Sequence, residues 1–339
     1  MTSPPGDGPG GSGPVGHPHT DVEYYRAWTD SRPVISCALW EAEPGETDAG
    51  TAAGPGGGTG NGDLEHAQDR KLRTMARLAG VRPGMDVLDI GCGAGAMLDH
   101  LVQACGVRSA HGIELCESFC REIRRRNTPG VTVDCLDYAD YRPRHRFDAV
   151  ISISMVEFLS GAWEPGRETE GQALREFFRR TREWTRPGAG LALEVVIRGP
   201  RGLDEETSRA GSDALAKMGE SPGAPPALPH LLTAADGLWE LRSVRTHRQD
   251  WLRTLSVWEA RALAAQETIT ARWGGGRDAG HAPFGPPRAG ELPHGTTLHG
   301  TPLVPPRGGG TSTRVGRLTR AAMPACRLPL HAAQNEPLT

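Results

Sequence analysis

The stretch Val87-Leu-Asp-Ile-Gly-Cys-Gly-Ala-Gly95 (VLDIGCGAG) decides the fold of this 339-residue chain. A short apolar run over residues 85–90 leads into three glycines, and a segment with helical periodicity follows them. A glycine-rich turn between a buried strand and a helix lets the backbone approach a ligand, which then faces the helix amino terminus. The stretch therefore predicts a nucleotide site at the carboxyl end of a strand.

Strand and helix patterns alternate on both sides of this motif. Short apolar runs predict strands, and apolar residues repeating every three or four positions predict helices. The predicted strands cover residues 85–90, 110–115, 131–136, 148–155 and 191–197, and the predicted helices cover 64–78, 97–102, 117–126 and 172–185. We therefore expect an α/β, doubly wound Rossmann-like fold, with a mostly parallel central sheet flanked by helices. A further strand near 241–246 precedes a helix that starts at about Trp251.

Composition predicts where this domain begins and ends. Residues 1–18 are rich in Gly, Pro and Ser and are predicted to be a disordered N-terminal tail. The α/β domain occupies residues 19–270, interrupted by a Gly-rich stretch at 44–62 that we expect to be a flexible insertion. Residues 271–339 are of low complexity and are predicted to be a disordered C-terminal tail, although a change of reading frame near residue 271 would also produce such a break in composition.

The bulk properties exclude several classes of protein. A net charge of −3 argues against a general nucleic-acid binder. None of the seven cysteines forms a CxxC pair or a Cys/His spacing suited to zinc, so no metal site is expected. The amino terminus lacks the apolar core of a signal peptide, and the chain lacks a run long enough to cross a membrane. We expect a cytoplasmic protein, and the oligomeric state stays open.

Acids after three successive strands sharpen the prediction of the ligand. The glycines have the spacing GxGxG, and the preceding LDIG acid is typical of S-adenosylmethionine (SAM) sites rather than of dinucleotide folds. Glu114 ends the second strand, where it could accept hydrogen bonds from ribose hydroxyls, and Asp137 and Tyr138 follow the third, where they could bind and stack on adenine. The predicted SAM-binding residues are Asp89, Gly91, Cys92, Gly93, Gly95, Glu114, Leu115, Asp137 and Tyr138.

Further segments, in matching order, make the chain resemble the cyclopropane-fatty-acyl-phospholipid synthase family of class I SAM-dependent methyltransferases. The similar segments are residues 19–22 (HTDV), 36–40 (SCALW), 64–68 (LEHAQ) with Lys71, 137–140 (DYAD), and 251–255 (WLRTL) with Trp258. The resemblance implies transfer of a methyl or methylene group from SAM to an unsaturated lipid acyl chain. It implies a lipid or other small-molecule substrate and no nucleic-acid partner, and the Arg-rich tail could add peripheral contact with membrane lipid.

The same resemblance implies a bicarbonate ion beside the reacting carbon. Of the residues that hold this ion in the family, Cys37 and Glu157 match, whereas Phe158 stands in the place of a histidine and Trp251 in that of a tyrosine. Phenylalanine cannot donate a hydrogen bond to an anion, while the indole keeps one donor. The expected catalytic residues are therefore Glu157, Cys37, Trp251 and Phe158, with bicarbonate bound weakly or not at all.

Other interpretations of these residues stay open. Glu157 could be a partly solvated loop acid, Cys37 a small buried residue, and Trp251 a core residue at a helix start. The two replaced positions also fit a C- or N-methyltransferase of a small secondary metabolite, such as an amine or a prenyl chain. The 44–62 insertion and the altered C-terminal segment would fit a degraded paralogue that binds SAM weakly, or a non-catalytic partner.

Overall fold

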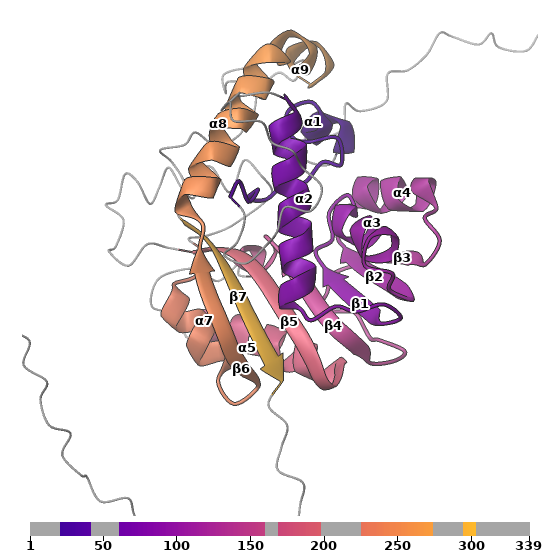
Figure 1. Cartoon of the computed structure of the whole chain (residues 1–339), viewed down its shortest axis with the longest axis vertical. Coiled ribbons are helices and arrows are strands. Elements are labelled where there is room, and N and C mark those ends of the chain that lie inside the picture. Colours follow the sequence, from indigo (N-terminus) through magenta and orange to yellow (C-terminus); the bar gives the residue numbers. More distant parts are fainter. Residues whose placement is uncertain (1–20, 42–60, 160–168, 198–224, 274–293, 303–339) are drawn as a thin grey trace, which may run out of the picture. The chain divides into compact units, whose positions relative to one another are not determined.

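The fold is described from a computed structural model, for residues 21–41, 61–159, 169–197, 225–273 and 294–302 (Figure 1). Its centre is a seven-stranded sheet of order β3-β2-β1-β4-β5-β7-β6. The first five strands are β1 (Asp86–Ile90), β2 (Ser109–Glu114), β3 (Val131–Cys135), β4 (Phe147–Ile153) and β5 (Thr185–Ile197). These five strands pair in parallel, which confirms the predicted doubly wound sheet. The sheet is completed by β6 (Trp239–Thr246) and by β7 (His294–Pro302), which is antiparallel to both of its neighbours.

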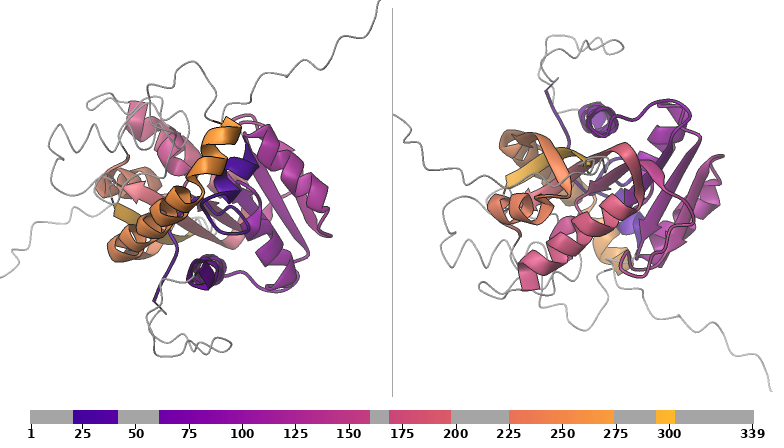
Figure 2. Two further views of the ribbon diagram at one scale, coloured as in Figure 1. Left: turned by 90° about the horizontal axis from the view of Figure 1, so that it is seen from above. Right: turned by 90° about the horizontal axis from the view of Figure 1, so that it is seen from below.

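Helices cover both faces of the sheet (Figure 2). One face packs against α2 (Asn61–Leu78), α3 (Ala96–Gln103) and α4 (Glu117–Arg126). The other face packs against α5 (Thr169–Glu183) and α7 (Leu228–Ala235). Because successive side chains of a strand point to opposite faces, a strand covered on both sides buries apolar side chains on both. In β1, Leu88 and Ile90 accordingly join the cluster under α5, and Val87 joins the cluster under α3.

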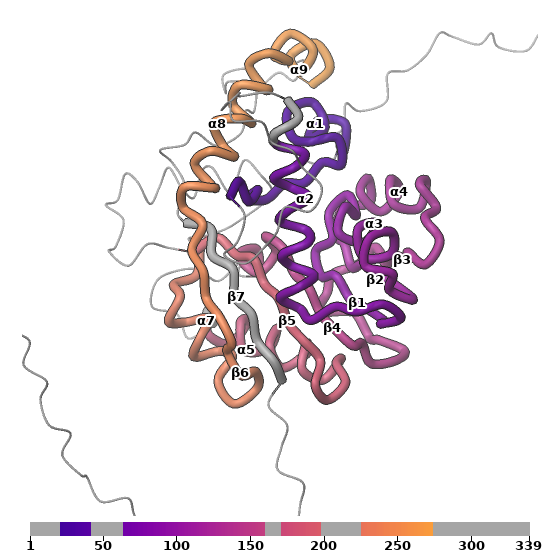
Figure 3. The backbone as a smooth tube through the Cα atoms, in the orientation of Figure 1, coloured from indigo at the N-terminus to yellow at the C-terminus, as the bar shows by residue number. Residues whose placement is uncertain are grey.

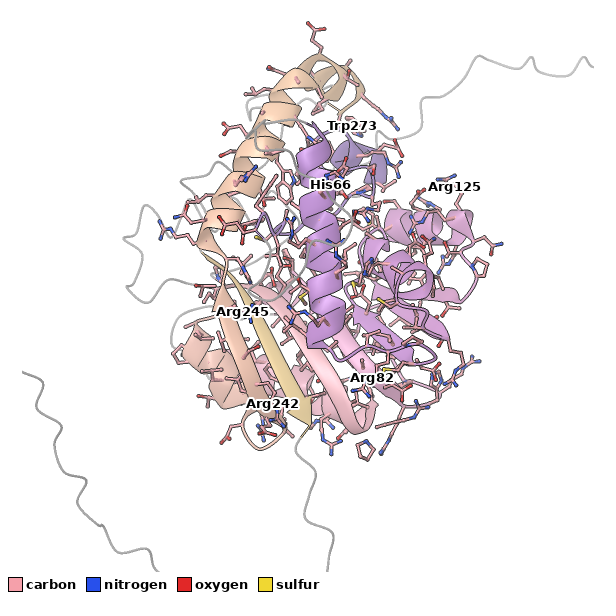
Figure 4. The ribbon with its side chains drawn as sticks, in the orientation of Figure 1. His66, Arg82, Arg125, Arg242, Arg245 and Trp273 are labelled. Atoms are coloured by element: carbon pink, nitrogen blue, oxygen red, sulfur yellow. The ribbon has the colours of Figure 1, made fainter. Side chains whose placement is uncertain are left out.

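A third group of elements lies beyond the carboxyl ends of the strands: α1 (Val22–Arg26), residues 34–40, α8 (Arg248–Ala264) and α9 (Gln266–Trp273) (Figure 1). Aromatic residues dominate its core, where Trp28 meets Trp258 edge to face with ring centroids 5.3 Å apart. Trp273, labelled in Figure 4, donates from its indole nitrogen to an Asp21 oxygen at 3.0 Å and joins α9 to the start of α1. The tube in Figure 3 shows α2 running from the level of α1 towards the start of β1.

Two predictions about the domain boundaries are wrong in part. Residues 271–273 lie in α9, and residues 294–302 form β7 inside the sheet, although both fall in the predicted disordered tail. The sequence of β7, HGTTLHGTP, has little apolar content, but pairing with two neighbours satisfies its backbone groups whatever its side chains are. Residues 61 and 62, predicted to belong to the flexible insertion, begin α2. Residues 1–18, 44–60 and the remainder of the C-terminal segment lie outside the described residues. Within the described part of the chain, no helix is both long and apolar enough to cross a membrane.

Candidate active site

The glycine loop between β1 and α3 has the backbone conformation that its sequence predicts. Gly91, Gly93 and Gly95 have φ values of 74°, 54° and 82°, which disfavour residues with a Cβ. A Cβ on Gly91 would also lie 2.4 Å from Cγ of Met155, which follows β4. Arg126 fixes the far side of the loop by donating to the carbonyl of residue 94 at 2.6 Å. The loop is therefore held by two other parts of the chain.

Glu114, the last residue of β2, binds the glycine loop directly. Its two carboxylate oxygens accept the backbone N–H groups of Gly93 and Cys116, each at 2.8 Å. Each oxygen keeps a second lone pair, so the carboxylate can still accept hydrogen bonds from ribose hydroxyls. Burial raises the pKa of Glu114, opposed by those N–H groups. The next residue, Leu115, is 72% exposed and offers an uncovered apolar surface beside this acid.

Asp89 is a buried acid of this edge with one oxygen unpartnered in the described part of the chain. It is 2% exposed, and its Oδ1 has no hydrogen-bond partner among the described residues. Burial raises the pKa of Asp89 to about 7; the charge of Glu114 adds to the shift and that of Lys71 opposes it. An unpaired buried carboxylate oxygen costs free energy, and a cationic ligand would recover that cost.

The other predicted cofactor residues differ in their surroundings. Cys92 is buried against β2, where a Cβ on Gly112 would come within 2.5 Å of its sulfur, so its side chain packs rather than faces a ligand. Asp137 is exposed and accepts the backbone N–H of residue 139 at 2.8 Å. The ring of Tyr138 lies 6.0 Å from that of Phe177, so stacking on adenine would use its remaining surface. The adenine contacts of Asp137 and Tyr138 stay predictions.

Glu157 follows β4 in the short 3-10 helix η2 (Val156–Phe158). It is 2% exposed, which excludes the solvated loop acid that the sequence also allowed. Burial raises the pKa of Glu157 to about 8, and the charge of Glu194 adds to this; backbone N–H groups and the Ser154 hydroxyl oppose it. Its Oε2 has no hydrogen-bond partner within the described residues. Phe158, next in η2, is half-buried, and its approach to a substrate stays a prediction.

Cys37 and Trp251 lie in one buried cluster beyond the sheet edge. Burial raises the pKa of the Cys37 thiol far above its usual range, so the thiol is neutral, and its sulfur points to the carbonyl of residue 38 at 3.4 Å. Trp251 is 3% exposed and meets Trp258 edge to face at 5.6 Å. Its indole N–H has no acceptor among the residues that the structure describes, which leaves a buried donor for a bound group.

Sequence reasoning missed Glu194 and the role of Lys71. Glu194, in β5, is 5% exposed, and its Oε1 accepts the Cys37 backbone N–H at 3.0 Å. Lys71, in α2, is 1% exposed; its Nζ lies 3.8 Å from Oε2 of Glu194 and donates to the Ser36 hydroxyl. Burial raises the pKa of Glu194 and lowers that of Lys71. The signal that could have found Glu194 was an acid inside the apolar run LALEVVI.

Together, these residues form an acid-rich edge at the carboxyl ends of β1, β2, β4 and β5. Asp89, Glu114, Glu157 and Glu194 all contribute to it, while Lys71 is the one lysine or arginine that is buried among the described residues. No group of three His, Cys, Asp or Glu side chains in that part of the chain could hold a metal ion. Buried carboxylates favour a cationic ligand, and they can orient a ligand or move a proton.

Comparison with known proteins places the chain in a family. The family model for mycolic acid cyclopropane synthetase matches residues 16–275. The chain belongs to this family. Its cyclopropane-fatty-acyl-phospholipid synthase relative from Escherichia coli K12 is 29% identical over 153 residues, which are 43% of this chain and 33% of that enzyme. The tuberculostearic acid methyltransferase UfaA1 of Mycobacterium tuberculosis is 27% identical over 190 residues, or 52% of this chain and 38% of that enzyme.

The matched part spans only about a third of the length of these curated relatives. Among solved structures, the mycolic acid cyclopropane synthase CmaA1, in complex with S-adenosylhomocysteine (SAH) and CTAB, superposes with a TM-score of 0.64. The superposition covers 85% of this chain and 96% of that one at 18% identity. At this identity the likeness establishes the methyltransferase fold, which agrees with the strand order given above.

Proposed function

We propose that this chain is a SAM-dependent methyltransferase that transfers a methyl or methylene group to an unsaturated lipid acyl chain. The observation that carries the proposal is the desolvated, acid-rich edge next to the glycine loop, with carboxylate oxygens of Asp89 and Glu157 left without partners among the described residues. SAM carries a sulfonium and an ammonium group, so it is the kind of cation that such an edge favours. The name of the family and the names of its relatives point to lipid acyl chains.

The residues at the carboxyl ends of β1 and β2 are suited to bind SAM. The glycine loop and the amino terminus of α3 would face its polar groups, and Glu114 would accept from the ribose hydroxyls. The orphaned Oδ1 of Asp89 would accept from the ammonium group. The exposed Leu115 would be covered by the adenine ring. When bound, SAM supplies the activated methyl group, and these residues only bind and orient it.

The elements beyond the sheet edge fit an apolar acceptor. The cluster around Trp251, Trp258 and Leu255 is apolar, and aromatic faces stabilise a carbocation that forms when an alkene is methylated. Leu263, in the last turn of α8, is 64% exposed. We propose that it contributes to peripheral contact with the lipid surface from which the acyl chain enters.

The test combines cofactor binding with label transfer. SAM binding is measured by calorimetry, and transfer is measured with methyl-tritiated SAM on vesicles of unsaturated and of saturated phospholipid. We expect binding, label on the unsaturated lipid only, and a product heavier by one CH2 unit. Gly91→Ala, which would place a Cβ against Met155, is the control that should lose binding. Binding without label on any lipid would reject the lipid substrate, and label on amines instead would favour an amine methyltransferase.

A further inference from the structure

Glu194 lies beside residues that the resemblance places at the reaction centre. Its backbone pairs with Ile153 at the end of β4, shortly before Glu157, and the charges of the two acids act on each other. Its carboxylate is shared between the Cys37 N–H, at 3.0 Å, and the Lys71 ammonium, at 3.8 Å. Both contacts join residues that are far apart in the sequence. The fold therefore places the Glu194 carboxylate within hydrogen-bond distance of the Cys37 backbone N–H.

This arrangement does not fit an added bicarbonate ion. The resemblance implies that Cys37 and Glu157 hold that ion, but the Cys37 N–H already donates to Glu194. A second anion beside the Glu194 carboxylate would be repelled, and Lys71 is already engaged with Ser36 and Glu194. The Trp251 indole N–H is a neutral donor, and one neutral donor offsets little of the cost of desolvating an anion.

We propose that the Glu194 carboxylate is the built-in proton acceptor of the reaction, in the place where the resembling family uses bicarbonate. The proposal rests on the proposed methyl transfer to an alkene. It assigns a catalytic role to a residue of β5, and a positioning role to Lys71 and to the Cys37 backbone, which hold the carboxylate in place.

Of the two buried glutamates, Glu194 is the one suited to accept a proton. The charges of Lys71 and His247 and the Cys37 N–H all favour its ionised form against the effect of burial. Glu157 has no such cation, and its pKa of about 8 keeps it protonated at neutral pH. Neighbouring acids whose surroundings separate their protonation states commonly divide acid and base roles in this way.

The step balances without a further reactant. The alkene π pair forms a bond to the SAM methyl carbon, and the sulfur–carbon bond breaks with its electron pair remaining on sulfur, which gives SAH and a carbocation. A proton then leaves either the transferred methyl group or the neighbouring carbon. The freed C–H pair closes a cyclopropane ring in the first case and forms a new double bond in the second. In both cases the proton passes to a Glu194 oxygen, and nothing is oxidised or reduced.

The decisive variants remove the carboxylate in two ways. Glu194→Gln keeps the size and an acceptor for the Cys37 N–H but cannot take up a proton, so turnover should fall by about 10²–10⁴-fold while SAH affinity is kept. Glu194→Ala opens the position, and added formate or bicarbonate should restore part of its turnover. Glu183→Gln, which changes an acid at the end of α5 that pairs with Arg179, is the control and should leave turnover unchanged. Circular dichroism shows whether each variant is folded.

A second measurement does not depend on finding the acceptor. Carbon-13 NMR of labelled bicarbonate is recorded with the SAH complex of the wild type and of Glu194→Ala. We expect line broadening only with Glu194→Ala, because only that variant frees the Cys37 N–H. If the wild type binds SAH but methylates no lipid, the proposed function fails, and this arm still decides whether Glu194 excludes the ion.

Three results would overturn the proposal. The first is wild-type turnover that falls when buffers are depleted of carbon dioxide and recovers with bicarbonate. The second is full turnover by Glu194→Gln. The third is a folded, SAH-binding Glu194→Ala whose activity no small anion restores, since that would make Glu194 a structural residue only. Bicarbonate-independent wild-type turnover together with anion rescue of Glu194→Ala would support it.

Discussion

Acidic residues at the two ends of the same parallel strands differ in their hydrogen-bond partners and in the direction of their pKa shifts. At the amino end, Asp86 of β1 accepts hydrogen bonds from Nε and Nη2 of Arg108 and from the Ser109 hydroxyl. Nη2 of Arg186 also lies 3.7 Å from its Oδ2. These bonds lower its pKa to about 2. At the carboxyl end, three residues along the same strand, Asp89 keeps an unpartnered oxygen among the described residues, and burial raises its pKa to about 7.

The difference separates structural acids from acids held ready for a ligand. Arg82, labelled in Figure 4, lies in the turn at the amino end, where arginines surround the carboxylates. At the carboxyl end, Lys71 is the one buried cation of the described chain and must serve several acids. A fold gains no stability from leaving buried carboxylates without partners, so their presence indicates a site that a ligand completes.

The largest effect should come from removing Lys71. Lys71→Met leaves Glu194 buried without its cation, which should lower the free energy of unfolding by about 3–5 kcal/mol. Arg108→Met at the amino end should cost far less, because Arg108 is 63% exposed and Arg186 remains near Asp86. Urea unfolding followed by circular dichroism measures both. The double variant Lys71→Met/Glu194→Met should recover most of the loss, and equal losses for Lys71→Met and Arg108→Met would contradict the comparison.

The two ends should also respond to pH in opposite directions. Folding raises the pKa of Glu157 from 4.5 to about 8, so the folded protein binds more protons between these values and loses stability as pH rises through them. The slope from this one group is at most about 1.4 kcal/mol per pH unit. Folding lowers the pKa of Asp86 from 3.8 to about 2, so its contribution is present above 3.8 and is lost as pH falls towards 2.

Matched variants separate these two contributions. Glu157→Gln should flatten the decline of stability on the alkaline side and make the protein more stable than wild type above pH 8. Asp86→Asn should flatten the acid side and leave the alkaline side as it is. Thermal unfolding across pH measures both, and an unchanged alkaline slope in Glu157→Gln would mean that Glu157 is ionised in the folded protein.

A smaller effect is expected on cofactor affinity. Asp89→Asn removes the charge proposed to bind the SAM ammonium, which should cost about 1.5–3 kcal/mol, or roughly 10–100-fold in Kd. Asp86→Asn, on the same strand but at the other end, should leave the Kd unchanged. Calorimetry in two buffers with different ionisation enthalpies should also show that wild type releases protons on binding SAM near pH 7 and that Asp89→Asn releases fewer. Equal Kd values for both variants would remove Asp89 from the site.

The parts of the molecule that the sequence predicts are those with local signals. The glycine loop, Asp89 and Glu114 lie within a few residues of a strand end, so periodicity and turn chemistry place them. The contact of Cys37 with Glu194 and that of Lys71 with the same carboxylate join distant segments, and no local pattern encodes such a distance. β7 is a related case, since its pairing with β5 and β6 rather than its composition makes it a strand.

Glu157 and Glu194 carry the same local signal in the sequence. Each is a carboxylate beside apolar residues, Glu157 in ISISMVEFLS and Glu194 in LALEVVI. The family resemblance points only to Glu157. The resemblance assigns the anion-holding positions to Cys37, Glu157, Phe158 and Trp251. Only the structure shows that the Cys37 backbone N–H already donates a hydrogen bond to the Glu194 carboxylate.

The smallest effect should come from Phe158→His, which restores the histidine that the resembling family has after Glu157. In the wild-type background, the change should alter the free energy of unfolding by about 1 kcal/mol or less, because Phe158 is only half-buried. It should not make turnover depend on bicarbonate, since Glu194 still holds the Cys37 N–H. In Glu194→Ala, by contrast, the added histidine should strengthen the response to bicarbonate. Turnover is measured over a series of bicarbonate concentrations in the wild type, Phe158→His, Glu194→Ala and the double variant. The comparison tests whether the effects of the two substitutions depend on each other. Bicarbonate dependence in the single variant Phe158→His would show that the ion binds despite Glu194, and it would contradict the proposed role of Glu194 as the proton acceptor.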